Sequence, residues 1–289
     1  MSTTKPLVSV SCIAYNHEKY IEKCIKSIIS QKTNFKIELL VYDDASTDKT
    51  PEIIKKYAEK HPEIIFPMLQ KENQFSKGGI RIMERYNFSR ANGKYIAICD
   101  GDDYWTDPYK LQKQVDFLES HPGYMVCGTR AKRVDENGKE YPDLSKISGE
   151  VSLNDIVKKN QFSASTTVFY AENYKEQLFD NYSDFKIGDW PLWCSLLQYG
   201  KGYNMKEVTA QYNIHSGGMV SGRNLSKTLE QKLSDRILLM DNIPAKKNII
   251  KKYGLRIIMH YIKKALRLQP GYGKALNKNK KLIIRFLTK

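Results

Sequence analysis

The most constraining feature of this chain is an apolar run that ends in three carboxylates. The residues of Tyr95–Cys99 are apolar or small, and Asp100–Asp103 follows them directly. A short apolar run of this kind is typical of a buried strand in an α/β sheet. Gly101 allows a tight turn, so that Asp100 and Asp102 can face one point. Ligands of open α/β sheets lie beyond the carboxyl ends of the strands, which is where these acids stand.

Neighbouring ionised carboxylates repel each other, so a chain that clusters them needs something to neutralise their charge. A hard divalent cation, Mg²⁺ or Mn²⁺, does this well, above all when it also holds phosphates. The competing interpretation is a solvated acidic turn whose aspartates cap a helix, because a short motif is weak evidence by itself. We expect Mn²⁺ or Mg²⁺ at this turn.

Predicted strands and helices alternate through the first half, which favours an α/β fold with a mostly parallel central sheet and flanking helices. The second half is less regular, with a hairpin expected around Glu136–Gly138, a helix at Asp189–Tyr199 and an extended segment at Tyr203–Ile214. The other expected strands are Leu7–Ala14, Lys36–Tyr42, Ile64–Leu69, Lys94–Cys99 and Ser165–Ala171, and the other expected helices are Tyr20–Ser30, Thr50–Lys60 with Thr50 as N-cap, Gly79–Ala91, Pro108–Ser120, Leu153–Lys159, Leu225–Asn242 and Lys246–Leu268.

Length and composition are those of a globular protein. With 289 residues, the chain suffices for one large domain, or for one domain with an appendage. Met1–Pro6 lacks the apolar core of a secretory signal, and no apolar run approaches the ~20 residues of a membrane span. We therefore expect a cytoplasmic location. The five cysteines lack C-x-x-C spacing, which predicts reduced core residues instead of zinc ligands or disulfides.

The net charge of +15 is concentrated at the C-terminal end. Fourteen of the 47 lysines and arginines lie in Lys246–Lys289, which has no Asp or Glu, so the rest holds 33 basic and 32 acidic residues. This distribution disfavours a nucleic-acid groove across the protein, and we expect no nucleic-acid partner. Lys246–Leu268 follows helical spacing, with residues such as Ile250 and Tyr261 on one face and cations opposite. Such a helix suits binding to an anionic membrane surface. The alternative is that its apolar face packs on the rest of the protein and its lysines are only solvated.

Polar segments follow three of the predicted strands and can converge at one edge of the sheet. They are Ala14–Asn16, Asp43–Asp48 and Asp100–Asp103. A nucleotide needs an aromatic face for its base, an acceptor for base N–H or ribose hydroxyls, and a metal for its diphosphate. Tyr15, Asp44 and the carboxylates of the third segment supply these groups in that order. Neither G-x-G-x-x-G nor a Walker A pattern is present, so phosphate binding of those types is not expected.

In this order, the motifs resemble glycosyltransferase family 2. The resemblance covers residues 7–218 and includes Val8–Asn16, Val41–Asp48 and Gly93–Asp103. Further on, Gly188–Trp193 stands where the family has its catalytic base, and Tyr212–Gly218 is similar to a late Tyr-x-x-His segment. The resemblance implies a GT-A fold, with a nucleotide-sugar half at about 1–122, an acceptor half at about 123–223 and a basic helical region at 224–289.

The resemblance also implies roles for individual residues. Asp189 would deprotonate the acceptor hydroxyl, although Gly188 replaces the acidic residue that usually precedes this base. Asp102 would ligate the metal, and His215 would complete the metal shell or hold the diphosphate. The residues expected to bind the nucleotide sugar are Ala14, Tyr15, Asn16, Asp44, Asp100 and Gly101.

The function implied is inverting transfer of a sugar from a nucleotide-diphosphate sugar, expected to be a UDP-sugar, to a hydroxyl of a glycan or lipid-linked acceptor. The expected setting is bacterial envelope polysaccharide synthesis, with the enzyme peripheral on the inner membrane face. Inverting transfer needs a base on the acceptor side and neutralisation of the departing diphosphate on the other.

Two other classes remain open from the sequence. A nucleotidyltransferase shares the sheet and metal site but needs a Gly-rich basic loop after the first strand, which Ala14–Glu18 is not. The other alternative is a non-enzymatic module that binds a membrane or a nucleic acid through the basic tail. Trp105, Trp190 and Trp193 could form a platform for a sugar ring, although core packing is the commoner fate of tryptophan.

Overall fold

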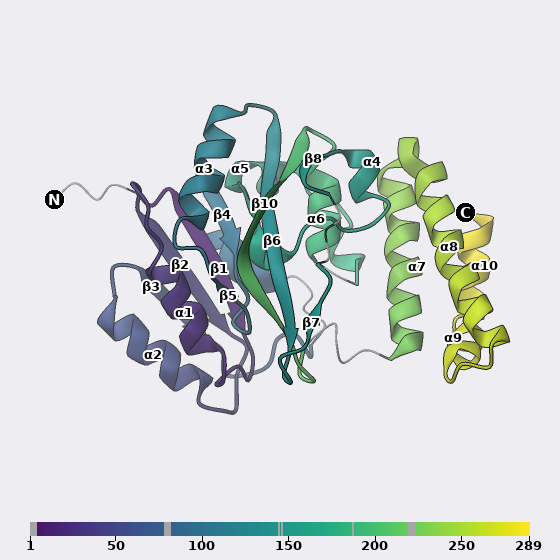
Figure 1. Cartoon of the computed structure of the whole chain (residues 1–289), viewed down its shortest axis with the longest axis horizontal. Coiled ribbons are helices and arrows are strands. Elements are labelled where there is room, and N and C mark those ends of the chain that lie inside the picture. Colours follow the sequence, from purple (N-terminus) through teal and green to yellow (C-terminus); the bar gives the residue numbers. More distant parts are fainter. Residues whose placement is uncertain (1–4, 78–81, 144, 146, 187, 219–223) are drawn as a thin grey trace.

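The computed structural model describes residues 5–77, 82–143, 145, 147–186, 188–218 and 224–289. Within these residues a single mixed sheet forms the centre, and the C-terminal helices stack beside it (Figure 1). The strands are β1 (Val8–Ala14), β2 (Ile37–Asp43), β3 (Ile65–Leu69), β4 (Tyr95–Ile98), β5 (Tyr104–Trp105), β6 (Tyr124–Asp135), β7 (Glu140–Tyr141), β8 (Gly149–Val151), β9 (Val168–Tyr170) and β10 (Lys201–Ile214). The α-helices are α1 (Ile21–Ile29), α2 (Thr50–Lys60), α3 (Lys110–Ser120), α4 (Leu153–Ile156), α5 (Ala171–Gln177), α6 (Asp189–Leu196), α7 (Leu225–Asn242), α8 (Lys247–Leu266), α9 (Tyr272–Lys278) and α10 (Lys280–Thr288).

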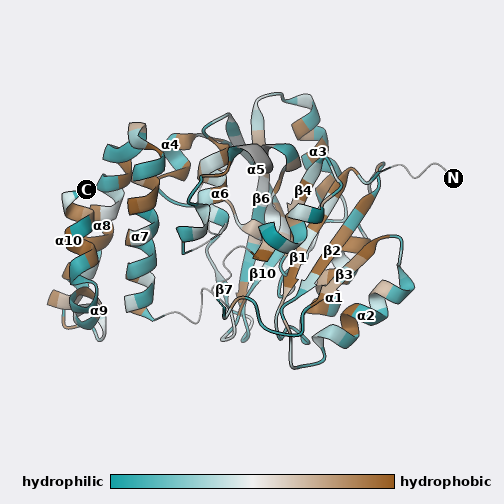
Figure 2. Cartoon of the chain, turned by 180° about the vertical axis from the view of Figure 1, so that it is seen from behind, coloured by the Kyte–Doolittle hydropathy of each residue, from teal (hydrophilic) through white to brown (hydrophobic). Residues whose placement is uncertain are grey.

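The sheet has the order β3-β2-β1-β4-β9-β6-β10-β5, with β7 paired to β6 and β8 to β10. Strands β3, β2, β1 and β4 run parallel, as do β6 and β10, whereas β9 is antiparallel to both of its neighbours. Hydrophobic residues dominate β1, β2 and β3 (Figure 2). Strands β1 and β2 are buried on both faces, whereas Phe66 and Pro67 of the edge strand β3 are exposed. The expected α/β fold with a mainly parallel central sheet is confirmed. The carboxyl ends of β1, β2 and β4 therefore share one edge.

The segment before β4 is less regular than its sequence predicts. A helix is expected over Gly79–Ala91, but the structure has a π-helical turn η1 (Met83–Asn87) and a 3₁₀ turn η2 (Phe88–Arg90), while residues 79–81 lie outside the described residues. The buried Asn87 amide donates to Ser11 Oγ (3.0 Å) and to the Cys12 carbonyl (3.2 Å). The segment is therefore fixed by its contacts with β1 and does not form the regular α-helix that its sequence pattern predicts.

The start of α2 also differs from its prediction. Thr50, the expected N-cap, is the first helical residue, and Lys49 holds the cap position. The Thr50 hydroxyl instead accepts a hydrogen bond from the His17 amide at 2.8 Å. The side chain thus ties the segment after β1 to α2.

The tryptophans and cysteines serve the core. Trp105, Trp190 and Trp193 are only 4%, 5% and 0% exposed, so they do not form a platform for a ligand. All five cysteines are buried and free, in agreement with the expected reduced thiols.

The C-terminal helices form a stack whose apolar faces point inward. Ile250, Ile258 and Tyr261 of α8 are buried in the same apolar cluster as Leu229 of α7 and the sheet-side residue Trp193. The apolar face that the sequence offers to a membrane is therefore used for packing. Within the described residues, no helix combines the length and the apolar character that crossing a membrane requires.

Phe286 holds α10 in this stack. Its ring lies so close to Gly254 of α8 that a Cβ at that glycine would stand 2.0 Å from the ring Cζ. We expect Phe286→Ala to lower the free energy of unfolding by about 3–5 kcal/mol, because a fully buried ring leaves a cavity. Urea denaturation followed by circular dichroism measures this change. Phe66→Ala, at a ring that is 40% exposed, is the control, and equal effects of both changes would contradict the packing of α10.

Candidate functional site

The segments that follow β1, β2 and β4 are joined at one edge of the sheet. Ala14 ends β1, and its carbonyl accepts a hydrogen bond from the Asp44 amide (3.0 Å). The Gly101 amide donates to the Ile13 carbonyl (2.8 Å), and a Cβ at Gly101 would stand 3.0 Å from the His17 ring. The acidic turn is therefore held against the end of β1, and a glycine is required for this close approach.

Tyr15 and Asn16 lie on the outer side of this edge. The Tyr15 side chain is 45% exposed, as an aromatic face for a ligand requires. Asn16 has a left-handed backbone (φ 56°), and its side-chain oxygen accepts from the Thr47 amide at 2.8 Å. This bond fixes the backbone from which Tyr15 projects.

Asp44 is less available than its predicted role suggests. Its carboxylate is 2% exposed and accepts hydrogen bonds from the amides of Gln74 (2.8 Å) and Phe75 (3.0 Å) and from the Tyr42 hydroxyl (3.0 Å). A carboxylate accepts about four hydrogen bonds, so roughly one position remains for a base. The observed function of Asp44 is to anchor the turn around Phe75, and contact with a base stays a prediction.

Asp102 lies between two histidines, one of which precedes it in the chain by 85 positions and the other of which follows it by 113 positions. Its Oδ2 is 3.0 Å from His215 Nε2 and 3.8 Å from His17 Nε2. One ligand atom from each of these three residues lies within 4.8 Å of the others. We call these three residues the histidine–aspartate group. Two imidazoles and a carboxylate are an ordinary ligand set for a divalent transition ion.

Strand β10 delivers His215 to this position. The Asn213 amide donates to Asp103 Oδ1 at 2.9 Å, and the Asn213 side chain donates to the Asp102 carbonyl. Asp103 is 2% exposed and supports the turn. The end of β10 is therefore fastened directly to the acidic turn.

Electrostatics favour charge on Asp102 and a neutral His17. Burial alone would raise the pKa of Asp102, but the hydrogen bond with His215 and the charges of both histidines bring it below the ordinary value. The hydrogen bond with Asp102 raises the pKa of His215, whereas burial lowers that of His17. His17 Nδ1 is buried and has no hydrogen-bond partner among the described residues. A neutral imidazole beside a carboxylate is the form that binds a metal.

The sequence analysis missed His17. The residue directly follows the Ala14–Asn16 segment, and this position is the signal that could have found it. Its partner Asp102 is 85 positions further along the chain, so only the tertiary structure pairs them.

Asp189 contributes to the electrostatics of the acidic turn. The pKa of Asp100 is raised to about 8 by burial and by the charges of Asp102 and Asp189. Asp189 itself begins α6, and burial raises its pKa to about 6. Its Oδ1 accepts from the Trp190 amide (2.7 Å), so it also satisfies one amide of the first turn of α6.

Two residues that the sequence analysis did not single out support Asp189. The Asn160 amide donates to Asp189 Oδ2 at 2.8 Å. Arg236 of α7 lies over the Trp190 ring at 4.7 Å and donates to the Lys158 carbonyl at 3.1 Å. Helix α7 thus supports both the residue after Asp189 and the loop that carries Asn160. Neither contact has a local sequence signal.

The fold and this site define a class: a mixed α/β protein with an acidic turn at the carboxyl edge of its sheet. The comparisons give the family. The model for glycosyl transferase family 2 matches residues 9–181. The Bacillus subtilis protein named as glycosyltransferase EpsE is 33% identical over 208 residues, which are 70% of this chain and 71% of EpsE. The chain therefore belongs to glycosyl transferase family 2.

Solved structures show the same fold. Residues 1-349 of Staphylococcus aureus TarS, crystallised with UDP-GlcNAc, have a TM-score of 0.69 and 22% identity, with 93% of this chain and 79% of that crystallised chain covered. The mannosyltransferase PcManGT from Pyrobaculum calidifontis, in complex with GDP-Man and Mn²⁺, has a TM-score of 0.63 and 17% identity, with 99% and 83% covered. The matches to three mycobacterial relatives, each 33% identical over 215 residues, span 60% of the length of those proteins.

Proposed function

We propose that this chain is an inverting glycosyltransferase that moves a sugar from a UDP-sugar to a hydroxyl of a glycan or lipid-linked acceptor in bacterial envelope polysaccharide synthesis. The observation that carries the proposal is that Asp189, held by Asn160, interacts electrostatically with Asp100 of the acidic turn. Asp189 is half-buried at the start of α6, and its charge acts on Asp100 of the acidic turn, which also carries Asp102 of the histidine–aspartate group. Inverting transfer needs such a base and such a leaving-group site on two sides of the sugar.

In the proposed step, Asp189 takes the proton of the acceptor hydroxyl. The acceptor oxygen forms a bond to the anomeric carbon, and the bond from that carbon to the diphosphate oxygen breaks with its electron pair leaving on the diphosphate. Asn160 and the Trp190 amide orient the Asp189 carboxylate for this transfer. Tyr15 would pack against the base or ribose, with Asn16 holding its backbone.

The residues of the histidine–aspartate group fit a divalent ion. Asp102 and His215, with His17 as a further ligand, would hold it, and it would neutralise the diphosphate as a Lewis acid. The two imidazoles favour Mn²⁺ over Mg²⁺, which prefers oxygen ligands and dehydrates reluctantly. The Mn²⁺ in the PcManGT complex supports this choice.

Activity should depend on pH through Asp189. A base must be ionised, and because the pKa of Asp189 is raised to about 6, its ionised fraction decreases as the pH falls below that value. We expect kcat/KM to be level above about pH 7 and to fall about tenfold per unit well below pH 6. Initial rates of UDP release between pH 4.5 and 8.5 measure the profile. A profile that stays level down to pH 4.5 would contradict a base with this pKa.

The experiment that tests the function is a screen for UDP release from a panel of UDP-sugars with Mn²⁺ present. Release that depends on Mn²⁺ and on Asp189 supports the transferase. Pyrophosphate release from a nucleoside triphosphate and a sugar phosphate would support the nucleotidyltransferase alternative. No turnover of any nucleotide sugar, and no binding of any nucleotide, would overturn the proposal.

A further inference from the structure

The C-terminal helices carry a second set of apolar side chains that the core does not use. Leu255, Met259 and Leu266 of α8 are 38%, 49% and 77% exposed, and Leu268, just after the helix, is 90% exposed. We call these four residues the outer stripe. They are distinct from the buried face of α8 around Ile258.

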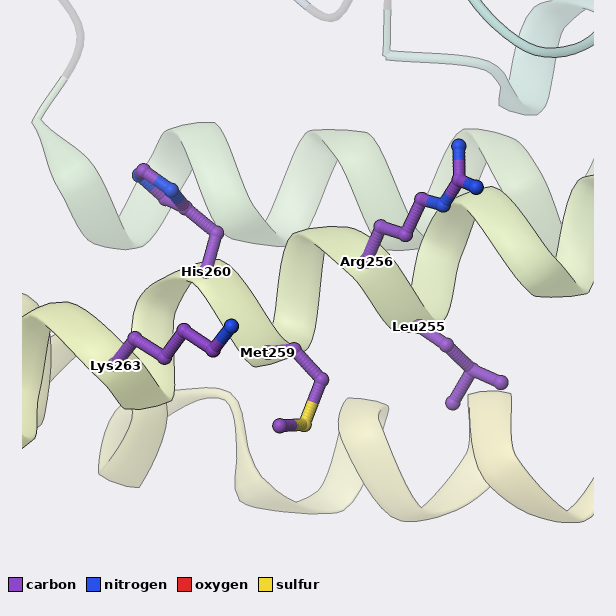
Figure 3. Close-up of a pocket in the computed structure, with 5 residues that line it drawn as sticks. All are labelled: Leu255, Arg256, Met259, His260 and Lys263. Atoms are coloured by element: carbon purple, nitrogen blue, oxygen red, sulfur yellow. The ribbon is translucent and has the colours of Figure 1, made fainter.

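The spacing of the outer stripe places its helical members on one side of α8. Positions 255, 259 and 266 lie within about 40° of one another around a helix and extend over about 16 Å. Figure 3 shows Leu255 and Met259 on one side of the helix, with Arg256 and His260 on the other. These four residues and Lys263 line a pocket. The helical members of the stripe therefore lie along one side of α8.

Leu268 has an unusual backbone for an exposed leucine. Its φ is 53°, in the left-handed region that favours glycine, and its amide donates to the Ala265 carbonyl at 3.0 Å. A glycine would end α8 in this conformation without strain. The leucine instead presents a large apolar side chain at the tip of the helix, where only an apolar partner would remove it from water.

Cations surround the stripe. Lys252 and Lys263 are exposed on α8 and lie within about 60° of the stripe's centre around the helix, and Arg267 is exposed between its last two leucines. Residues 246–289 include no acidic residue. Leucines beside lysines match a bilayer with anionic headgroups, where charge attracts the helix and the acyl region receives the apolar side chains. A nucleic acid would satisfy the cations but leave the leucines in water.

The tip of α8 lies at the same end of the molecule as the candidate site. The Tyr261 hydroxyl donates to the Leu225 carbonyl at 3.2 Å, and a Cβ at Gly271 would stand 3.3 Å from the Leu225 side chain. Leu225 is the first residue of α7. Figure 1 shows the α9 end of the stack on the side to which β6 and β10 point.

We propose that the outer stripe docks on the surface of an anionic phospholipid bilayer and brings the candidate site to that surface. The inference rests on the proposed function, since a transferase that acts on lipid-linked acceptors must work there. The face of α8 that the sequence offers to a membrane, around Ile250 and Tyr261, is buried, so the proposed membrane contact is the outer edge of the helix instead.

The test is flotation of the full chain with vesicles of phosphatidylglycerol and phosphatidylcholine, compared with phosphatidylcholine alone. Removing residues 246–289 would be a poor test, because it would uncover the buried face of α7. Leu266→Glu/Leu268→Glu changes exposed side chains only. Val208→Glu, at a valine of β10 that is 52% exposed, is the matched control, and Lys263→Glu/Arg267→Glu tests the cations.

We expect the wild type and Val208→Glu to float only with anionic vesicles, and both double variants to float at least about tenfold less. All four proteins should bind UDP alike. Absence of wild-type flotation, equal flotation of Leu266→Glu/Leu268→Glu, or tighter binding to duplex DNA than to vesicles would overturn the docking surface. Flotation without turnover of any nucleotide sugar and without binding of any nucleotide would overturn the proposed function and leave the docking surface standing.

Discussion

Asp189→Asn is expected to lower kcat about 10²–10⁴-fold, because the amide cannot take the proton of the acceptor hydroxyl. The substitution preserves the size of the side chain, and its oxygen can still accept from the Trp190 amide. The affinity for UDP should remain within about twofold of the wild type, since the role proposed for Asp189 is on the acceptor side. Steady-state UDP release and calorimetric titration with UDP separate the two effects.

Asp184→Asn is the matched control, because Asp184 is an exposed acid in the same part of the chain. It should retain wild-type kcat. If Asp189→Asn kept more than about a tenth of the wild-type kcat, general-base catalysis by Asp189 would be wrong, since such catalysis contributes at least about a hundredfold. A parallel loss of UDP affinity would instead place Asp189 in donor binding.

Asp102→Asn is expected to abolish the dependence of UDP binding on Mn²⁺. The wild type should bind UDP at least about tenfold more tightly with Mn²⁺ than without, a difference of about 1.4 kcal/mol. The variant should bind with the weaker affinity under both conditions, because the amide is a poor ligand between His17 and His215. Calorimetric titration with and without Mn²⁺ measures all four affinities.

Asp180→Asn, at an exposed acid away from the histidine–aspartate group, is the control and should keep the Mn²⁺ effect. His17→Ala adds a second comparison. If His17 is a third metal ligand, this variant should lose part of the Mn²⁺ effect on UDP binding. If the role of His17 is purely structural, the variant should keep the whole Mn²⁺ effect. If the wild type bound UDP equally well with and without Mn²⁺, the histidine–aspartate group would not be a metal site for the donor.

The acidic turn could be predicted because all of its information is local. An apolar run forms a buried strand, a glycine permits the turn, and the carboxylates follow within four positions. The histidine–aspartate group could be predicted only in part. Asp102 and His215 stood out by motif, but His17 joins them through the parallel pairing of β1 with β4, which no local pattern encodes.

Helical periodicity gave an incomplete account of α8. The pattern identified the apolar face with Ile250 and Tyr261, and that face does exist. Periodicity does not identify the surface against which this face packs, because α7 and a bilayer both offer apolar surface to the same residues. The structure buries this face on α7 and leaves Leu266 and Leu268 outside.

By itself, the sequence determined the α/β class, the order of the first strands, the acidic turn and the basic C-terminal end, since each depends on residues close together in the chain. The tertiary structure decided which distant residues meet. It paired His17 with Asp102, placed Asn160 on Asp189, and used Asp44 as a loop anchor. Such contacts depend on strand pairing and burial across more than twenty-five positions of the chain, where periodicity carries no information.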